Sequence, residues 1–262
     1  MTNQEKRNEF ASLIDQSSNI VFFTGAGIST ESGIPDFRSP GTGIWNKISP
    51  IEFQDFVGSE KVRKESWKRK FGGRTRWDEA DPNVGHKAIC HLIQNAKARS
   101  VITQNVDNLH QKSGVPDEKV IELHGNAGYA KCLSCGSRFD LDELKEEFER
   151  LGQIKPCRRC GGIIKTATIS FGQPMPEEAM QRAQRETIAS DLFVVVGSSL
   201  VVYPAAGFPE LATSFGIPLV IVNREPTPLD SIASLVIHDE IGPTFEFVLG
   251  IDHSSSAESS RA

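Results

Sequence analysis

The sequence predicts an α/β fold, a parallel sheet covered by helices, with a smaller module inserted into the chain. Short apolar runs alternate with helical patterns, which is typical of a parallel sheet with both faces covered. Glycines or polar residues follow the end of these runs, where open parallel sheets bind their ligands. Two C-x-x-C pairs lie in a charged stretch, residues 129–165, that interrupts the alternation. We therefore expect a Rossmann-like sheet with an inserted zinc-binding module.

The expected elements follow from the period of the apolar residues. The strands are the apolar runs at residues 20–23, 100–103, 192–196 and 218–222, a short strand at 120–123, and a returning strand at 166–171. The helices are residues 3–16, a helical insertion at about 46–83 whose first helix starts at Ser49–Pro50, residues 88–96, a helix between the cysteine pairs, and residues 176–188. On this division, residues 1–128 and 166–251 form the Rossmann-like domain. The Ser-rich residues 252–262 are expected to be a disordered tail.

Composition narrows the classes of function. A chain of 262 residues with 38% hydrophobic residues can bury a core of its own. The formal net charge of −5 argues against nucleic acid as the main partner, since binding to phosphates needs a clustered basic surface. No stretch reaches the apolar length of a membrane span, and Met1–Phe10 is polar, unlike a signal peptide. We expect a cytoplasmic protein that makes no direct contact with nucleic acid or membrane.

The stretch Thr24–Arg38 is the strongest candidate for a nucleotide site. It follows the first strand, and Gly25 and Gly27 would let backbone N–H groups approach a diphosphate at the start of the next helix. The usual dinucleotide pattern is incomplete, because Thr30 occupies the third glycine position and no acidic residue follows about twenty positions on. An ordinary strand-to-helix turn is the alternative. The run Ile34–Arg38, with an aromatic residue between two charges, favours a functional loop.

The paired cysteines predict one structural metal ion. Cys132 and Cys135, and then Cys157 and Cys160, can each reach a tetrahedral ion from a tight turn. Four thiolates complete the coordination of Zn²⁺ and leave no position for a reacting water, so the ion would be structural. The alternative is two unligated pairs on the surface. Cys90 lies on an apolar helix face and is expected in the core.

His124 is the candidate general base. It follows the strand at 120–123 and faces the same sheet edge as the glycine loop, where a histidine can exchange protons near neutral pH. A hydrogen-bonded structural histidine is the alternative at this position. The other histidines have no comparable setting.

Together these motifs resemble the sirtuins, the NAD-dependent protein lysine deacylases. The resemblance covers about Asn19 to Leu249. The motifs that carry it are, in order, Gly25–Ser29, Gly33–Arg38, Gln104–Asp107, His124–Gly125, the paired cysteines, Gly197–Ser199 and Asn223–Glu225.

The resemblance implies NAD as the cofactor and His124 as the catalytic base. The implied NAD contacts are Gly25, Ala26, Gly27, Ser29, Asp36, Phe37, Arg38, Trp45, Gln104, Asn105, Val106, Asp107, Gly197, Ser198, Ser199, Asn223, Arg224, Glu225 and Ile241. Within this set the glycines would hold the diphosphate and the residues from Gln104 to Asp107 the nicotinamide. Asn223 and Glu225 would hold the adenosine ribose, and Ile241 would lie against the adenine.

The implied reaction begins when the acyl-lysine oxygen attacks the ribose carbon and nicotinamide leaves. The ribose 2′-hydroxyl then attacks with His124 as base. The acyl-lysine peptide is expected to lie extended between the two modules and to add a strand. The family's Phe-Gly-Glu near the peptide reads Phe171-Gly172-Gln173 here, which removes an attraction for basic peptides.

The expected acyl group is neutral. Family members that take acidic acyl groups hold them with a Tyr and an Arg in the helical insertion, but the two tyrosines of this chain, Tyr129 and Tyr203, lie elsewhere. The insertion instead resembles that of the class II branch. Trp67 and Phe71 share a helix face there and either line an acyl channel or pack the insertion against its neighbours.

Two other functions are compatible with the motifs. Mono-ADP-ribosyltransfer would use the same cleavage of NAD without the same base. A non-catalytic NAD sensor would keep the glycine loop and the cysteines, but it would not need His124, Asn105 and Asp107 together. The presence of His124 favours deacylation.

Overall fold

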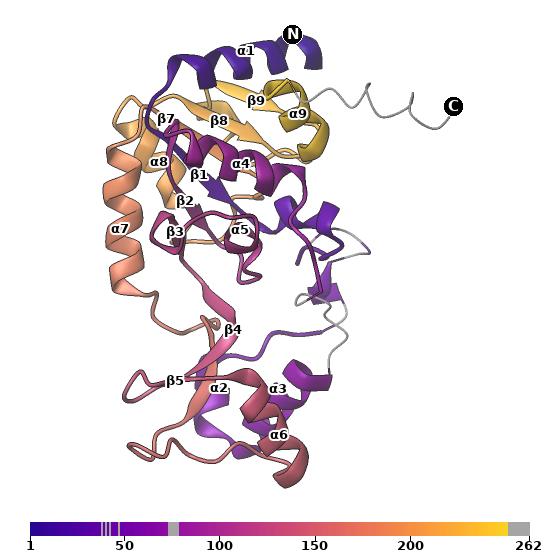
Figure 1. Ribbon diagram of the computed structural model, residues 1–262, viewed down its shortest axis with the longest axis vertical. Helices are drawn as coiled ribbons and strands as arrows, with labels where there is room; N and C mark the ends of the chain where they lie inside the picture. Colours follow the sequence, from indigo (N-terminus) through magenta and orange to yellow (C-terminus); the bar gives the residue numbers. More distant parts are fainter. Residues whose placement is uncertain (38, 40, 42, 47, 73–78, 251–262) are drawn as a thin grey trace, which may run out of the picture.

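The computed structural model describes residues 1–250 apart from residues 38, 40, 42, 47 and 73–78 (Figure 1). Arg38 and the predicted tail at 252–262 lie outside the described residues. Figure 1 shows two parts at opposite ends of the molecule, a large sheet covered by helices and a small sheet, with β4 running between them. Among the helices of the described part, none combines the length and apolar character needed to cross a membrane.

The large sheet has six parallel strands in the order β3-β2-β1-β7-β8-β9. The strands are β1 (Ile20–Thr24), β2 (Ala98–Thr103), β3 (Val120–Glu122), β7 (Leu192–Val196), β8 (Leu219–Val222) and β9 (Leu235–Ile237). The predicted parallel sheet is thus confirmed. Sequence analysis missed β9, because three residues at a sheet edge are too few to show a period.

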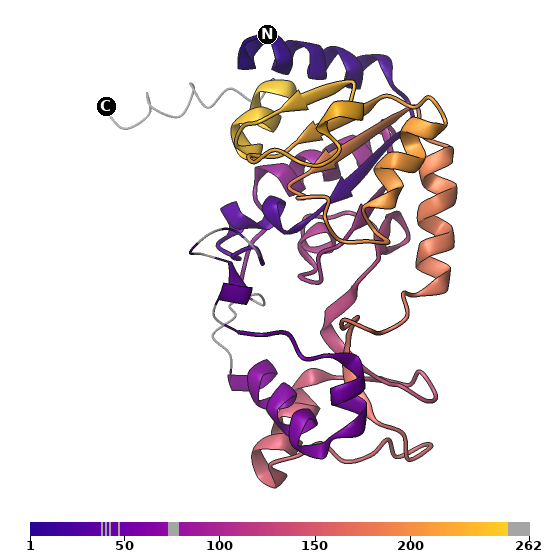
Figure 2. The ribbon, with the colours of Figure 1, turned by 180° about the vertical axis from the view of Figure 1, so that it is seen from behind.

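Both faces of the large sheet are buried, which explains why its strands are apolar throughout. Every residue of β1, β7 and β8 is buried. Phe22 and Val194 belong to a core shared with α1 (Asn3–Gln16), α4 (Val84–Gln94) and α9 (Ile241–Val248). Their neighbours Phe23 and Val195 belong to the core shared with α7 (Glu177–Ile188) and α8 (Gly207–Ser214) on the other face (Figures 1 and 2). Successive residues of a strand thus supply opposite cores.

The order of the strands reverses at β1. From β1 the chain adds β2 and β3 on one side, whereas β7, β8 and β9 lie on the other side. Loops that leave β1 and β7 in opposite directions open a crevice at their carboxyl ends, the usual ligand site of such sheets. Gly25 follows β1 and Gly197 follows β7 at this point.

The small sheet is antiparallel, with strand order β5-β4-β6. Its strands are β4 (Gly125–Cys132), β5 (Arg138–Phe139) and β6 (Ile164–Thr168), and the helices beside it are α2 (Phe53–Gly58), α3 (Glu60–Gly72) and α6 (Leu141–Leu151). Trp67 of α3, Leu144 of α6 and Ile164 of β6 share one apolar core. The helical insertion therefore packs on the cysteine-bearing segment.

Three predicted elements differ in the structure. The strand expected at 166–171 is β6, which starts at Ile164, ends at Thr168 and pairs with β4 of the small sheet. The helix expected from Ser49–Pro50 starts instead at Phe53, because Glu52 is extended and the Phe53 amide bonds the Phe171 carbonyl at 2.9 Å. The helix after the glycine loop is a 3-10 helix, Ala26–Ser32.

The close approach of the turns after β1 and β7 yields a prediction about stability. Gly197 has a φ of 63°, and a Cβ built on it would lie 2.3 Å from the Ile28 nitrogen. We expect Gly197→Ala to lower the free energy of unfolding by at least about 2 kcal/mol, because strain and overlap add. Gly207→Ala is the matched control, since a Cβ on Gly207 meets nothing within 4 Å. Urea unfolding measures both, and equal stabilities would contradict this account.

Candidate NAD and zinc sites

A cleft of about 630 Å³ lies at the carboxyl ends of the central strands, within the usual size range of small-molecule sites. We call it the main cleft. Of the residues predicted to contact NAD, those that line it are Gly25, Ala26, Gly27, Asp36, Phe37, Trp45, Gln104, Asn105, Val106, Gly197, Ser198, Ser199, Asn223, Arg224, Glu225 and Ile241. His124 also lines it. Segments as far apart in the chain as Gly25 and Ile241 therefore meet in one site.

The two glycines of the loop act differently from the expectation. The amide groups of Gly25 and Gly27 bond the backbone oxygens of Val196 and Gly197, at 3.1 and 2.8 Å, so they do not point at a ligand. A Cβ on Gly25 or Gly27 would lie 2.7 Å from the Gly197 oxygen. Glycine is needed here because two backbone turns touch. Because their own amides are engaged, the two glycines shape the wall of the main cleft through packing.

Asn105, which is buried, is held by bonds to the glycine loop. Its side-chain amide donates to the Gly25 oxygen at 3.0 Å and to the Ser29 hydroxyl at 3.2 Å. The Ser29 hydroxyl donates in turn to Asp107 Oδ2 at 2.7 Å. Burial raises the pKa of the Asp107 carboxyl. These bonds fix an amide and a carboxylic group in a preorganised pocket wall, as selective binding of a planar carboxamide requires.

Ser29 and Asp107 line a smaller hollow next to the main cleft rather than the cleft itself. Asn105, Val106 and Phe37 line both spaces. The predicted nicotinamide residues therefore do lie together, at a side chamber of the main cleft. The predicted contact Arg38 falls outside the described residues.

A hydrogen bond to the backbone orients the His124 ring. Its Nδ1 lies 3.0 Å from the backbone oxygen of Gln104, which can only accept. In the neutral ring Nδ1 must then carry the proton, which leaves Nε2 as the basic nitrogen. The histidine backbone is also held, because its oxygen accepts from the Ile169 amide at 2.8 Å. The ring is therefore set in the tautomer that a general base needs.

The far end of the main cleft is polar. The Asn223 side chain donates to the Glu225 backbone oxygen at 2.6 Å. Arg224 forms ion pairs with Glu225 at 3.3 Å and Glu240 at 3.4 Å. Ile241 is buried beside them. This end thus offers carboxylates for ribose hydroxyls next to an apolar surface for a base.

An aromatic row closes the cleft on another side. The ring of Trp45 lies 5.3 Å from Phe37 and 5.3 Å from Phe171, measured between centroids. Asp36 is tied to the same loop, because its Oδ1 accepts from the Ser39 amide at 2.8 Å. The rings of Phe37, Trp45 and Phe171 therefore bring apolar area to the wall of the cleft, which can exclude water.

Several residues that line the main cleft were not predicted. They are Thr30, Glu31, Ser39, Thr168, Ile169, Ser170, Met175, Val202, Tyr203, Pro204, Asp239 and Glu240. Asp239 and Glu240 follow β9, so the rule that polar residues after a strand form the site would have found them, had β9 been predicted. Nothing in the sequence marks Val202 or Tyr203, which reach the cleft through the path of the loop before α8.

Trp67 and Phe71 do not line the main cleft. Trp67 is buried and its ring stacks on Phe71 at 5.3 Å, and Phe71 lies 5.7 Å from Phe148 of α6. The packing alternative is therefore correct, and the acyl-channel hypothesis for these two rings is wrong. Their neighbours are engaged elsewhere too. Arg69 pairs with Glu65 at 2.8 Å, and the Lys70 amine donates to the Ala127 oxygen at 2.9 Å.

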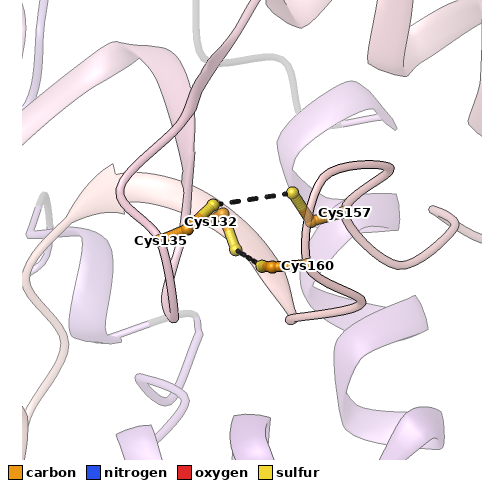
Figure 3. Close-up of side chains that lie close together, drawn as sticks. All are labelled: Cys132, Cys135, Cys157 and Cys160. Carbon is orange, nitrogen blue, oxygen red and sulfur yellow. Dashed lines mark hydrogen bonds between the residues drawn. The ribbon is translucent and has the colours of Figure 1, made fainter.

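The four predicted metal ligands converge in the small sheet (Figure 3). The sulfurs of Cys132 and Cys160 lie 3.4 Å apart, those of Cys135 and Cys157 3.8 Å apart, and all four lie within 4.8 Å of one another. A tetrahedral ion with Zn–S bonds of about 2.3 Å places its sulfurs about 3.8 Å apart, so the cluster fits zinc. Cys90 is buried in the large core, as expected. With four sulfur ligands the ion would be structural.

Comparisons with known proteins agree with this geometry. Residues 25–204 match the model of the Sir2 family. The chain is 52% identical over 236 residues to the NAD-dependent protein deacetylase of Rhodopseudomonas palustris, with 90% of this chain and 93% of the relative covered. It is 55% identical over 232 residues to NAD-dependent protein deacetylase 1 of Bradyrhizobium diazoefficiens, with 88% and 91% covered.

Solved Sir2 structures superpose closely on this chain. A Sir2 structure with deacetylated p53 peptide and 3′-O-acetyl ADP-ribose superposes with a TM-score of 0.84 at 35% identity, covering 93% of this chain and 97% of that one. A Sir2 structure with a propionylated peptide superposes with a TM-score of 0.81 at 34% identity, covering 94% and 98%. The sequence, the fold and the arrangement of the cleft lead to the same conclusion: this chain belongs to the Sir2 family.

Proposed function

We propose that this protein is an NAD-dependent protein lysine deacylase, which moves the acyl group of an acyl-lysine to ADP-ribose and releases nicotinamide. The observation that carries the proposal is His124, held at the wall of the main cleft with Nδ1 bonded to the Gln104 oxygen. A base in a fixed tautomer is what acyl transfer to a ribose hydroxyl requires, and simple binding of NAD does not require it. Both relatives compared above carry the name NAD-dependent protein deacetylase.

We place NAD along the main cleft from the side chamber to the polar end. The nicotinamide would lie at Asn105 and Asp107, and the diphosphate at the contact between the glycine loop and Ser198. The adenosine ribose would lie at Asn223 and Glu225, with the adenine against Ile241. Each of these residues lines the main cleft or the side chamber.

The residues of the chamber would favour loss of nicotinamide. Asn105 and Asp107 hold the carboxamide in one orientation, and the rings of Phe37 and Trp45 limit access of water to the ribose. His124 Nε2 would then accept the proton of the ribose hydroxyl that attacks the acyl group. Bound NAD supplies the electrophilic ribose carbon.

The acyl-lysine peptide would enter beside the segment that follows β6. Ser170, Phe171 and Gly172 line the main cleft, and the Phe171 carbonyl is tied to the Phe53 amide. Gln173 also lines the cleft and is uncharged, so we expect a weaker preference for basic peptides than a glutamate would give. Related Sir2 structures contain acetylated and propionylated peptides.

Incubation with NAD and a panel of acylated peptides, followed by mass spectrometry, tests the proposal. Deacylated peptide, nicotinamide and acyl-ADP-ribose in equal amounts are expected. A peptide or protein that gains ADP-ribose would support mono-ADP-ribosyltransfer instead. Bound but unconsumed NAD would support a sensor.

We also propose that the protein works in the cytoplasm. The support is the cysteine cluster, whose four sulfurs converge on one point in a geometry that suits metal binding and not two disulfides. Thiolate clusters of this kind persist in reducing compartments.

His124→Ala is expected to lower deacylation by a factor of about 100 or more, because the general base is lost. NAD affinity should change little, since the ring is assigned to proton transfer. Steady-state kinetics and calorimetric titration with NAD measure the two effects. His91→Ala on α4 is the matched control, because His91 is exposed and does not line the main cleft. Full activity of His124→Ala would refute the mechanism.

Cys132→Ser is expected to lose bound zinc and to melt at a lower temperature than the unmodified chain. Structural zinc contributes on the order of 10 kcal/mol in small domains, so a weakened site costs folding. Metal analysis and thermal unfolding report the two losses without an activity assay. Cys90→Ala is the control and should keep its zinc. A Cys132→Ser protein that melted like the original and lost only turnover would show that the ion is not structural.

Neutral acyl groups are expected to be removed faster than succinyl on the same peptide. Arg69 and Lys70, the cations considered as carboxylate partners, do not line the main cleft, and both are engaged, Arg69 with Glu65 and Lys70 with a backbone oxygen. Neither is therefore placed to hold an acyl carboxylate. Competition kinetics with acetyl-, propionyl- and succinyl-lysine peptides measure kcat/KM for each. A value for the succinyl peptide above that for every neutral peptide would contradict this expectation.

A further inference from the structure

A polar network surrounds the backbone on either side of His124, and the chemistry described so far does not use it. Glu122 precedes the histidine by two residues at the end of β3, and Asn126 follows it by two residues at the start of β4. The Asn126 side chain donates to Glu122 Oε1 at 2.7 Å, which closes the turn that carries His124. The same Glu122 oxygen accepts from the Gln111 side chain at 2.8 Å.

The amide of Asn126 uses its full hydrogen-bonding capacity. Its nitrogen donates to Glu122 and to Asn108 Oδ1, and its oxygen accepts from Asn108 Nδ2 at 3.2 Å and from the Gly128 amide at 2.7 Å. An amide has two donor hydrogens and room for two acceptor bonds, so all four hydrogen-bonding positions of Asn126 are used. The residue is 5% exposed, which makes each lost bond costly.

The partner Asn108 is itself held in an uncommon conformation. Its φ is 63°, in the left-handed region, and it follows Asp107 directly. A Cβ on Gly128 would lie 2.6 Å from Asn108 Nδ2. A glycine at this position therefore leaves room for the contact between Asn108 and Asn126. The network therefore joins the segment of the nicotinamide chamber to the turn of the base.

This junction spans the hydrogen bond between the His124 ring and the Gln104 backbone oxygen. The acceptor of that bond, the Gln104 oxygen, belongs to the chamber segment, and its donor, His124 Nδ1, belongs to the turn. A small shift between the two segments would break this bond. The proton of the neutral ring would then no longer be held on Nδ1 by the Gln104 oxygen. Backbone bonds also join the segments, from Leu123 to Thr103 at 2.9 Å and from Ala127 to Val106 at 2.9 Å. Asn126 is the side-chain link that lies between these two.

The residues of the side chamber are also held by hydrogen bonds that do not involve Asn126. Asn105 is bonded to Gly25 and Ser29, and Asp107 accepts from Ser29 and from the Leu109 amide at 3.0 Å. Loss of the Asn126 amide should therefore disturb the base more than the nicotinamide contacts.

We propose that Asn126, held by Glu122, is a positioning residue that sets the orientation of His124. The proposal rests on the proposed deacylase function. In that reaction release and return of nicotinamide precede the step that needs the base. A positioning role for the base thus predicts unequal effects on two measurable rates: deacylation should fall, and nicotinamide exchange into NAD should persist.

The test compares Asn126→Asp with the unmodified chain, using one acetylated peptide and labelled nicotinamide. The aspartate keeps the shape of the side chain but faces Glu122 with a second carboxylate. Deacylation should fall at least about tenfold, the scale expected when a catalytic group is displaced by a fraction of an ångström to one ångström. Exchange should change less than about threefold.

Rescue provides the second arm. In Asn126→Asp with Glu122→Gln, the new amide at position 122 can donate to the aspartate and still accept from Gln111, whereas the bond to Asn108 Oδ1 stays lost. Deacylation should therefore rise above that of Asn126→Asp alone without reaching the rate of the unmodified chain. Asn95→Asp is the matched control, because Asn95 is exposed at the end of α4, and both of its rates should be unchanged. Asn126→Ala serves if Asn126→Asp does not fold, since it adds no second carboxylate.

Equal losses of deacylation and exchange in these variants would overturn the inference, as would unchanged deacylation or failure of both Asn126 variants to fold. In the last case the network would support the fold and not the base. An unmodified chain without deacylation would instead refute the proposed function, so the two failures can be distinguished.

Discussion

The contact between the turns after β1 and β7 is the constraint on which the site depends. The Gly27 amide donates to the Gly197 oxygen at 2.8 Å, and neither turn leaves room for a Cβ at the contact. This approach closes the base of the crevice that the reversal of strand order opens. It also fixes where the other strand ends can deliver side chains, because β2 and β8 are paired to β1 and β7. The glycines therefore shape the site through packing.

A second principle of the site is that its polar side chains are first bonded to the protein. Asn105 holds Gly25 and Ser29, Ser29 holds Asp107, and His124 is held by Gln104. Such groups lose little freedom when a ligand arrives, and their dipoles already point in one direction. The cost is that a change in one residue reaches its neighbours, which is why a side chain as remote from the reacting atoms as Asn126 can matter to the base.

The small sheet belongs to the same construction. β4 starts one residue after His124 and ends at Cys132, so the segment that carries the base continues directly into the cysteine cluster. β6 returns from the second cysteine pair and passes into the residues that line the cleft beyond Thr168. Metal binding at the cysteines would thus anchor both strands that frame the peptide side of the site. The core around Trp67 adds the helical insertion to this unit.

Sequence alone determined the features that depend on local pattern. The buried strands Ile20–Thr24 and Leu192–Val196 are apolar at every position but the last residue of the first, since both faces of the sheet are covered. The spacing of the four cysteines, in two C-x-x-C pairs, is sufficient to predict a tetrahedral metal site. The order of the motifs indicated the family. The rule that ligand-binding residues follow the carboxyl ends of parallel strands predicted that Gly25, Gln104, Ser198 and Asn223 share one edge of the sheet.

Tertiary structure decided the features that depend on contacts between distant segments. The start of α2 at Phe53 is set by a hydrogen bond to Phe171, more than a hundred residues away in the chain. The helix propensity of the residues around Phe53 carries no information about so distant a partner. Trp67 and Phe71 share a helix face in either environment, so their spacing could not tell an acyl channel from the core against α6. Gly25 and Gly27 were expected to let backbone N–H groups approach a diphosphate, and only the position of the turn at Gly197 showed that their own amides are already bonded within the protein. Sequence specifies which groups are available, whereas the packing of distant segments decides which of them remain for chemistry.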